Sequence, residues 1–394
     1  MTPAARTQAA VEILDQIIDA ARAGGAAGDT LIARYFATRR YAGSKDRRAV
    51  RELVYAAIRR AGEIPESGRA AMVGLAREDE TIAATFDGLG HGPAAIATDE
   101  PASKSGTAPA WIGKRFRVSE IDPVEAAALV ERAPLDLRVN VLKDGGHANL
   151  YSELGAEPIA GLPNALRLPS GTSIEATDAF REGLVEVQDA GSQMVTLAAK
   201  AAPGMAVIDL CAGAGGKSLA LAAAMANEGD ILATDTDRGR LSRLPQRAGR
   251  AGVSIIETRL LNPNSETEAL ADWTARADVV LIDAPCSGTG TWRRNPEARW
   301  RLTPARIERL VDTQRRLLSI AAPLVKPGGA LVYIVCSLLD EEGSGQITRF
   351  LSGHPGWNAE QSIPFGRPRG EGVRLTPAHD HTDGFFVARL VRPC

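Results

Sequence analysis

The first part of the chain has apolar residues at helical spacing. In ARTQAAVEILDQIIDAARAG and again in DRRAVRELVYAAIRRAG, apolar side chains recur every three or four positions, a pattern typical of amphipathic helices. This predicts an all-α domain within residues 1–100. Within residues 77–108 the periodicity weakens and acidic, Gly and Ala residues accumulate, so we interpret this stretch as a linker or as loosely packed helices.

A different pattern follows between residues 109 and 184. The runs DLRVNVLK (136–143) and ALRLPSG (165–171) alternate apolar and polar positions as half-buried strands do. The preceding run DPVEAAALVERA (122–133) has the spacing of a short helix. The region therefore predicts a small α+β module.

From about residue 185, short apolar runs alternate with helical stretches. This alternation predicts a doubly wound α/β sheet of the Rossmann-like class over residues 185–394. Ligands of such sheets bind at the carboxyl ends of the strands, so residues just past each run are candidates for a functional site. The runs are AVIDL (206–210), DILATD (230–235), DVVLIDAP (278–285), ALVYIVCS (330–337) and GFFVARL (384–390).

Composition narrows the class of protein. The chain has 394 residues, of which 44% are hydrophobic and 24% charged, as in an ordinary globular protein. No apolar run is long enough to span a membrane, and charged residues interrupt the N-terminus where a signal peptide would be apolar, so we expect a cytoplasmic protein, by default a monomer. Its four cysteines match no zinc pattern, and we expect no metal.

The charge is uneven along the chain. The net charge is −2, but residues 293–316 and 238–250 are rich in arginine. Such stripes are typical of a face that binds nucleic-acid phosphates. An arginine-rich solvated surface without a ligand explains them equally well.

The first strand end carries a glycine-rich turn, VIDLCAGAGGKS. Such a turn lets the backbone approach a ligand closely at the start of a helix. A P-loop would need Gly at position 211, and Cys211 stands there, which counts against an NTPase. Asp235 follows the turn by about 20 residues, where α/β folds place a ribose-binding acid, although it could equally be a helix cap. The two motifs leave open a nicotinamide cofactor or S-adenosylmethionine.

Two later strand ends carry thiols. Asp283, Pro285 and Cys286 follow one strand, and Cys336 ends the next. Each cysteine alone could be a buried structural residue, but together they would face one cleft. A thiolate that adds to carbon 6 of cytosine makes carbon 5 nucleophilic, which is covalent catalysis of a difficult methyl transfer. The thiolate needs a nearby cation, for which Lys217 is a candidate.

These residues carry a family resemblance. The motifs DLCAGAGGKS, DAPCSGTGTWRRNPE, VCSLLDEE and DGFFVARL resemble, in this order, the RsmB/Sun family of RNA cytosine-5 methyltransferases, over about residues 109–392. The N-terminal helices resemble the NusB-like RNA-binding domain of some bacterial members. The resemblance implies a class I methyltransferase domain that uses S-adenosylmethionine to methylate RNA, with 16S ribosomal RNA as the expected substrate.

The resemblance also implies roles for single residues. Cys336 corresponds to the nucleophile and Cys286 to the thiol that aids product release, with Asp283 and Lys217 beside them. The LRVN motif (137–140) corresponds to an RNA-side motif, and with the arginine-rich loop it gives Arg138, Asn140, Arg293 and Arg294 as RNA-contacting candidates. The expected cofactor-binding residues are Asp209, Cys211, Ala212, Gly213, Ala214, Gly215, Gly216, Lys217, Asp235, Asp283 and Pro285.

Departures from the family pattern keep other readings open. Val335 stands where Thr is expected, Ala214 replaces Pro, and residues 254–262 lack the acid expected near adenine, for which Glu257 is a possible substitute. One alternative is a non-catalytic RNA-binding or ribosome-assembly factor on this scaffold. Another is a dehydrogenase or NTPase, which would leave both cysteines unexplained.

Overall fold

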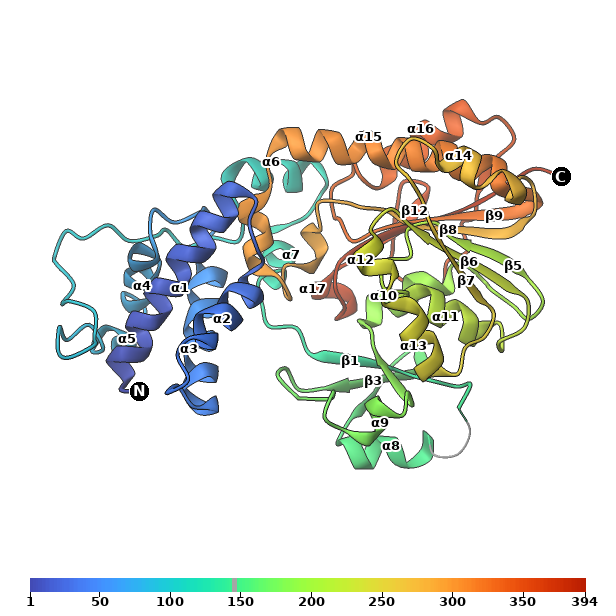
Figure 1. The fold of residues 1–394 in the computed structure, drawn as a ribbon. Helices are drawn as coiled ribbons and strands as arrows, with labels where there is room; N and C mark the ends of the chain where they lie inside the picture. Colours follow the sequence, from blue (N-terminus) through green and yellow to red (C-terminus); the bar gives the residue numbers. More distant parts are fainter. Residues whose placement is uncertain (144–146) are drawn as a thin grey trace. The chain divides into compact units, whose positions relative to one another are not determined.

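The computed structural model describes residues 1–143 and 147–394 (Figure 1). The chain forms two compact units, which we call the helical unit and the sheet unit. The helical unit comprises Met1–Glu131 and Thr291–Pro304, and the sheet unit comprises Arg132–Gly290 and Ala305–Cys394. Residues 132–184 of the expected α+β module share one compact unit with the expected Rossmann-like domain, whereas residues 109–131 belong to the helical unit.

The helical unit is built on one long amphipathic helix, α1 (Pro3–Ala23). The Thr2 side chain caps its first turn by accepting a hydrogen bond from the Ala5 backbone, and Gly24 ends it in the left-handed conformation. Its buried face, including Leu14 and Ile17, packs against α2 (Gly28–Ala37), α3 (Ser44–Arg60) and α4 (Gly68–Ala76). The unit also contains α5 (Glu80–Ala83), α6 (Ala110–Val118) and α7 (Pro123–Ala128).

The stretch expected as a linker is largely irregular but lies against these helices. The Glu100 carboxylate accepts hydrogen bonds from the Arg69 guanidinium, one of them at 2.9 Å. The Gly106 backbone N–H donates to the Arg60 carbonyl at 2.9 Å, and Phe86 is buried in the helical core. Residues 77–108 are therefore docked onto the helical unit.

A segment from much later in the chain completes this unit. It contains the 3₁₀ helix η3 (Pro296–Arg301), whose Arg299 is fully buried. The Arg299 guanidinium donates to the carbonyls of Ile58 and Ala61 at the end of α3, where helix carbonyls lack partners within the helix. Trp300 donates its indole N–H to Ala61 as well and packs into the helical core.

The sheet unit begins with a small antiparallel sheet. Its strand order is β2-β3-β1-β4, and its core includes Leu137, Leu166 and Val185. This sheet and its helices form the α+β part expected from the sequence, but the helix expected within residues 122–133 lies in the helical unit instead. Its elements are β1 (Leu135–Val139), α8 (His147–Leu154), β2 (Glu157–Ile159), β3 (Leu162–Leu168), α9 (Asp178–Arg181) and β4 (Val185–Val187).

The larger sheet has nine strands in the order β11-β12-β13-β9-β8-β5-β6-β7, with β10 paired to β13. The five strands from β7 to β9 are parallel, as is typical of a doubly wound sheet. The strand expected at 384–390 is β13, but it runs antiparallel to β9 and forms an antiparallel edge with β11 and β12, which corrects the expectation of a parallel strand there. The strands are β5 (Ala206–Asp209), β6 (Asp230–Asp235), β7 (Ile256–Leu260), β8 (Ala277–Asp283), β9 (Val325–Val335), β10 (Asn358–Ala359), β11 (Arg367–Arg369), β12 (Gly372–Leu375) and β13 (Phe385–Val391).

Helices cover both faces of this sheet (Figure 1). On β8, Val280 packs with α15 and α16, whereas its neighbour Leu281 packs with α11 and α13. Successive residues of a strand point to opposite faces of the sheet, and here helices cover both faces. This explains why these strands are continuous runs of apolar residues. The helices of the unit are α10 (Ala190–Leu197), α11 (Gly216–Ala224), α12 (Arg238–Leu241), α13 (Leu244–Ala251), α14 (Glu266–Ala269), α15 (Pro304–Ala321), α16 (Ser344–Gly353) and α17 (Pro377–Asp380).

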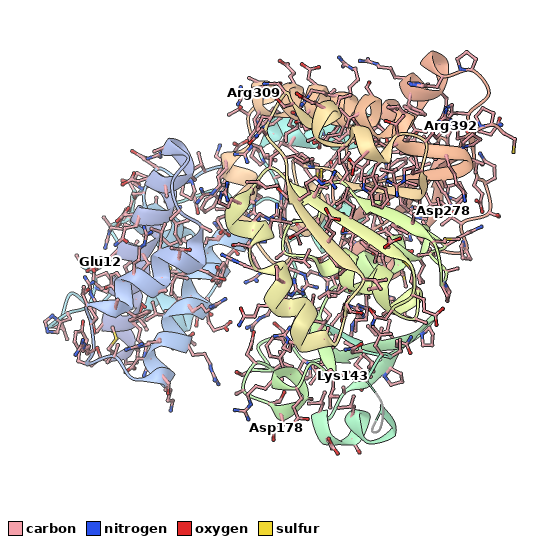
Figure 2. The ribbon with its side chains drawn as sticks, turned by 45° about the vertical axis from the view of Figure 1, so that its right-hand side comes forward. Glu12, Lys143, Asp178, Asp278, Arg309 and Arg392 are labelled. Atoms are coloured by element: carbon pink, nitrogen blue, oxygen red, sulfur yellow. The ribbon has the colours of Figure 1, made fainter. Side chains whose placement is uncertain are left out.

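Polar contacts also fix the amino-terminal edge of this sheet. Asp278, labelled in Figure 2, accepts a hydrogen bond from the Ala206 backbone at 2.9 Å and pairs with Lys326. The strands β5, β8 and β9 are thereby tied together at the edge away from the candidate site. Within the described residues, none of the helices combines the length and apolar character that crossing a membrane requires.

Candidate active site

The glycine-rich turn after β5 depends on two glycines. Gly213 and Gly215 have φ of 57° and 84°, the left-handed region that disfavours other residues. A Cβ on Gly215 would lie 2.4 Å from Cγ of Leu244, and one on Gly213 would lie 2.4 Å from the Arg240 guanidinium. The turn can therefore be this tight only with glycine at both positions.

Asp235, at the end of β6, holds this turn in place. Its Oδ2 accepts a hydrogen bond from the Gly213 backbone at 2.8 Å, and its Oδ1 accepts one from the Asp237 backbone at 2.7 Å. The other expected turn residues are fixed through their backbones: Ala212 N–H donates to the Thr234 carbonyl at 2.8 Å. The Ala214 carbonyl accepts from Arg247 at 2.7 Å.

Asp209 is the most buried acid of the turn. Its Oδ2 accepts a hydrogen bond from the Ser218 hydroxyl at 2.6 Å, whereas its buried Oδ1 has no hydrogen-bond partner among the described residues. Burial raises the pKa of this carboxyl to about 7, and the Ser218 hydrogen bond opposes the shift. Burial also raises the pKa of the neighbouring Cys211, which therefore stays a neutral thiol.

Lys217 and Asp283 form an ion pair between α11 and β8. Lys217 Nζ lies 2.6 Å from Asp283 Oδ2, and the lysine side chain is buried whereas the aspartate is one-third exposed. Burial opposes the charge on Lys217, but the carboxylate of Asp283 outweighs it and raises the pKa of the lysine. The pair therefore fixes the Asp283 carboxylate at the strand end.

The two thiols lie in contact. Because β8 and β9 are parallel neighbours with Asp283 opposite Ile334, the residues just past them meet at the same edge. The sulfurs of Cys286 and Cys336 are 3.4 Å apart, and neither forms a disulfide. The hydrogen bond to Cys336, with burial, raises the pKa of Cys286 well above its usual value. Cys286 thus keeps its proton and can donate to the Cys336 sulfur.

A cavity of about 350 Å³ brings the strand ends together. Six of the expected site residues line it: Cys211, Asp235, Asp283, Pro285, Cys286 and Cys336. Lys217 reaches it through Asp283, while Asp209 and Gly216 belong to the turn behind Cys211. The other lining residues are Leu210, Thr236, Asp237, Arg240, Leu261, Glu266, Ala284, Thr313, Arg316, Leu317 and Ile320.

The cavity wall contains an ion pair that sequence reasoning did not identify. The buried Glu266 accepts a hydrogen bond from Arg316 at 2.7 Å. Glu257, the suggested substitute for the missing acid, instead has an exposed side chain that pairs with Arg259. The spacing of Thr313, Arg316 and Ile320 on a predicted helix could have indicated that one face of α15 lines the site.

The expected RNA-contacting residues are mostly buried. Arg138 donates to the Gln188 side chain at 2.8 Å, and the Asn140 amide donates to the carbonyls of Gly183 and Ala251. Arg293 is 8% exposed, and Arg294 is half-buried. In this structure Arg138 and Asn140 hold the fold together, and contact of these four side chains with RNA stays a prediction.

The arginine-rich stretch is not one continuous stripe, which corrects the sequence interpretation. Residues 293–304 belong to the helical unit, where Arg299 is a core residue, and the remainder belongs to α15. On α15, Arg309 is exposed (Figure 2). The part of the chain that the structure describes contains no group of three or more His, Cys, Asp or Glu side chains arranged to hold a metal ion.

Comparison with known proteins gives a family match. Residues 195–391, half of the chain, match the family model described as 16S rRNA methyltransferase RsmB/F. The chain is 40% identical over 271 residues to the "Probable ribosomal RNA small subunit methyltransferase B" of Synechocystis sp., and 35% identical over 301 residues to the ribosomal RNA small subunit methyltransferase B of Citrobacter koseri. These matches cover 65% and 72% of this chain but 59% and 66% of the relatives. The chain thus spans less than two thirds of their length.

Solved structures show the same fold. The crystal structure of PH0851 matches with a TM-score of 0.77 at 25% identity, over 99% of both chains. A methyltransferase homologue from Pyrococcus horikoshii matches with a TM-score of 0.62 at 28% identity, over 72% of this chain and 94% of that chain. NSun6 from the same organism, solved with SFG, has a TM-score of 0.64 at 21% identity, over 72% of this chain and 97% of that chain. The expected Rossmann-like methyltransferase fold with a helical N-terminal region is confirmed.

Proposed function

Because the chain belongs to the family of 16S rRNA methyltransferases RsmB/F, we propose that it methylates carbon 5 of a cytosine in small-subunit ribosomal RNA. The observation that carries this proposal is the contact between the sulfurs of Cys286 and Cys336 at 3.4 Å, in a cavity that Asp283 also lines. Carbon 5 of cytosine needs activation by a nucleophile, and a thiol at a strand end supplies one. The names of the relatives support the class of RNA.

The residues fit S-adenosylmethionine as the methyl donor. A volume of about 350 Å³ lies within the range of small-molecule sites. Asp235 lines this cavity at the strand end that suits ribose hydroxyls. When bound, S-adenosylmethionine supplies a methyl group on a sulfonium.

The side chains of the site would then act in turn. The thiolate of Cys336 adds to carbon 6 of the ring, while Asp283, held by Lys217, lies where it can contact the base. After methyl transfer, carbon 5 loses its proton to water and the carbon–sulfur bond to Cys336 breaks. Cys286 keeps its proton and donates to the Cys336 sulfur, which stabilises the Cys336 thiolate as it leaves carbon 6.

Mass spectrometry of the Cys286→Ala variant, expressed in bacteria, tests this proposal. We expect a covalent protein–RNA adduct that maps to Cys336, because addition proceeds while release is impaired. The linked RNA fragment would identify the target. The Cys336→Ala variant, which lacks the nucleophile, is the matched control and should form no adduct.

A failure of this experiment is interpretable. A Cys286→Ala variant that folds, binds S-adenosylmethionine and yields no adduct with RNA from the source organism would contradict the roles of the two thiols. Full methyl transfer by Cys336→Ala would contradict the covalent mechanism. S-adenosylmethionine binding by neither the wild type nor any variant would contradict the methyltransferase proposal as a whole.

A further inference from the structure

A serine follows each of the two thiols, and both serines contact one buried acid. Ser287 follows Cys286, and Ser337 follows Cys336. Their hydroxyl oxygens lie 3.1 Å apart. Both hydroxyls donate to Oε2 of Glu342, that of Ser337 at 2.6 Å. The turns that carry the thiols are thus joined through a single carboxylate.

The second oxygen of this carboxylate holds the same region. Glu342 Oε1 accepts hydrogen bonds from the Ser287 backbone at 2.8 Å and from Gln314 at 3.1 Å. Gln314 also donates to the Pro285 carbonyl at 3.0 Å, directly before Cys286. The hydroxyl of Tyr333 donates to the Glu342 backbone carbonyl at 2.7 Å and fixes the acid in turn.

The burial of Glu342 indicates more than a packing role. The residue is fully buried, and its carboxylate accepts hydrogen bonds from serine and glutamine donors. A buried acid held by neutral donors is costly, and burial raises the pKa of Glu342 while the hydrogen bonds from both serines oppose the shift. An apolar residue would fill this space at less cost, but it could not hold two separate turns.

We propose that Glu342 is the positioning residue that holds Cys286 and Cys336 at reacting distance. This rests on the proposed function, because the two thiols matter only if they act on the base. The carboxylate accepts a hydrogen bond from the serine that follows each thiol. The two turns are thereby held together, with the sulfurs of Cys286 and Cys336 3.4 Å apart. A catalytic site loses much of its activity when its supporting residues let the reacting groups shift by about an ångström.

Charge gives Glu342 a second effect on the pair. Besides the hydrogen bond to Cys336 and burial, the negative charge of Glu342 raises the pKa of Cys286. This charge favours the protonated form of Cys286. Glu342 therefore acts on the turns that carry both thiols and on the protonation of Cys286.

A bifunctional thiol reagent tests the spacing without methyl donor or RNA. Dibromobimane becomes fluorescent when both of its arms are taken up by thiols, and the bridged peptides can be mapped by mass spectrometry. In the full chain carrying Cys394→Ala, which removes the exposed thiol, we expect a Cys286–Cys336 bridge. Glu342→Ala should lower the bridged fraction several-fold. Glu341→Ala, at the exposed neighbouring position, is the matched control and should leave it unchanged.

Kinetics supply a readout that a purely structural role would not move. In single-turnover methyl transfer, Glu342→Ala should slow the reaction by on the order of a hundredfold, the usual cost of an ångström of misplacement. The affinity for S-adenosylmethionine should stay unchanged, because Glu342 is not among the residues that line the cavity. Glu342→Gln keeps the volume but turns an NH₂ group toward other donors, so its effect should be smaller and in the same direction.

The outcomes separate the two proposals. Wild-type bridging and a wild-type single-turnover rate in folded Glu342→Gln and Glu342→Ala would overturn the positioning role. If Glu342→Ala does not fold, the same measurements on Glu342→Gln decide. If the wild-type chain transfers no methyl group, the proposed function fails, while loss of the bridge in the Glu342 variants would still support the positioning of the thiols.

Discussion

Single residues of this site were predictable where the chain itself places them. Asp283, Cys286 and Cys336 each follow a predicted strand, and parallel strands bring their carboxyl ends to one edge. Glu342 and Glu266 were not predictable as site residues, because their importance lies in contacts with residues far away in the sequence. In the sequence, a charged residue looks the same whether its side chain faces solvent, a cavity or the protein core.

The buried Asp209 predicts a pH dependence of stability. Its pKa of about 7 in the folded protein exceeds its usual value of 3.8. At Asp209, folding therefore takes up a proton between about pH 4 and pH 7, so the contribution of this residue to stability should fall as pH rises through this window and stay constant above it. Asp209→Asn removes this dependence. The free energy of unfolding of the variant relative to the wild type should rise across the window, by at most about 4 kcal/mol.

Urea unfolding of both proteins between pH 4 and pH 8 checks this. The comparison uses the change with pH and not the absolute difference, because Asn also alters the hydrogen bond from Ser218 at every pH. Parallel stability curves for the two proteins would show that Asp209 titrates alike in the folded and unfolded chains.

At the scale of elements, the strands were easier to predict than their pairing. The runs at 206–210, 230–235 and 278–285 correspond to β5, β6 and β8. They were predictable because a strand buried between two layers of helices is an almost continuous run of apolar residues. The antiparallel edge of β11 and β12 was not predicted. Its strands are short and partly exposed, and pairing direction depends on chain connections that local patterns do not record.

The turn between β5 and α11 predicts a contrast between neighbouring glycines. Gly215→Ala should lower the free energy of unfolding by about 1–2 kcal/mol, because alanine strains a positive φ and its Cβ would collide with Leu244. It should also weaken S-adenosylmethionine binding. Gly216→Ala, where a Cβ meets nothing within 4 Å, is the control for the effect on stability. Thermal unfolding and calorimetric titration of both variants measure the two effects, and equal behaviour would rule out the strain argument.

Helix α15 predicts a contrast between arginines. Arg309 and Arg315 are exposed, so replacing both by Ala should flatten the salt dependence of RNA binding, by a slope of about one for each phosphate that an arginine no longer neutralises. Arg299→Met should leave this slope unchanged and lower stability instead, because Arg299 is buried against the end of α3. Binding isotherms at several salt concentrations test both, and a slope that changes only in Arg299→Met would reverse the assignment.

At the scale of the whole molecule, the family resemblance is confirmed, and so is the combination of a helical N-terminal region with a Rossmann-like methyltransferase fold. The sequence did not predict that residues 291–304 belong to the helical unit. Their sequence is rich in arginine beside a site motif, which favours an RNA-binding loop, yet their side chains complete the core of the helical unit. Only the three-dimensional contacts distinguish these outcomes.

This organisation predicts how truncation would behave. A fragment of residues 132–394 keeps residues 291–304 but removes the carbonyls and apolar surface that Arg299 and Trp300 contact. Since exposed tryptophan and an unmatched apolar surface promote association, the fragment should aggregate. Size-exclusion chromatography compares it with the same fragment carrying Trp300→Ser, which should be more soluble. A monomeric, stable fragment without that change would contradict the expectation.

The late segment of the helical unit also has a consequence for synthesis on the ribosome. The chain leaves the helical unit after Glu131 and returns to it only at Thr291. Until Trp300 has emerged from the exit tunnel, the nascent helices lack part of their interior, so the core of the helical unit is completed only after residues 132–290 have been translated. A protease that cut the chain near residue 131 in the finished protein would, by the same topology, leave the pieces joined.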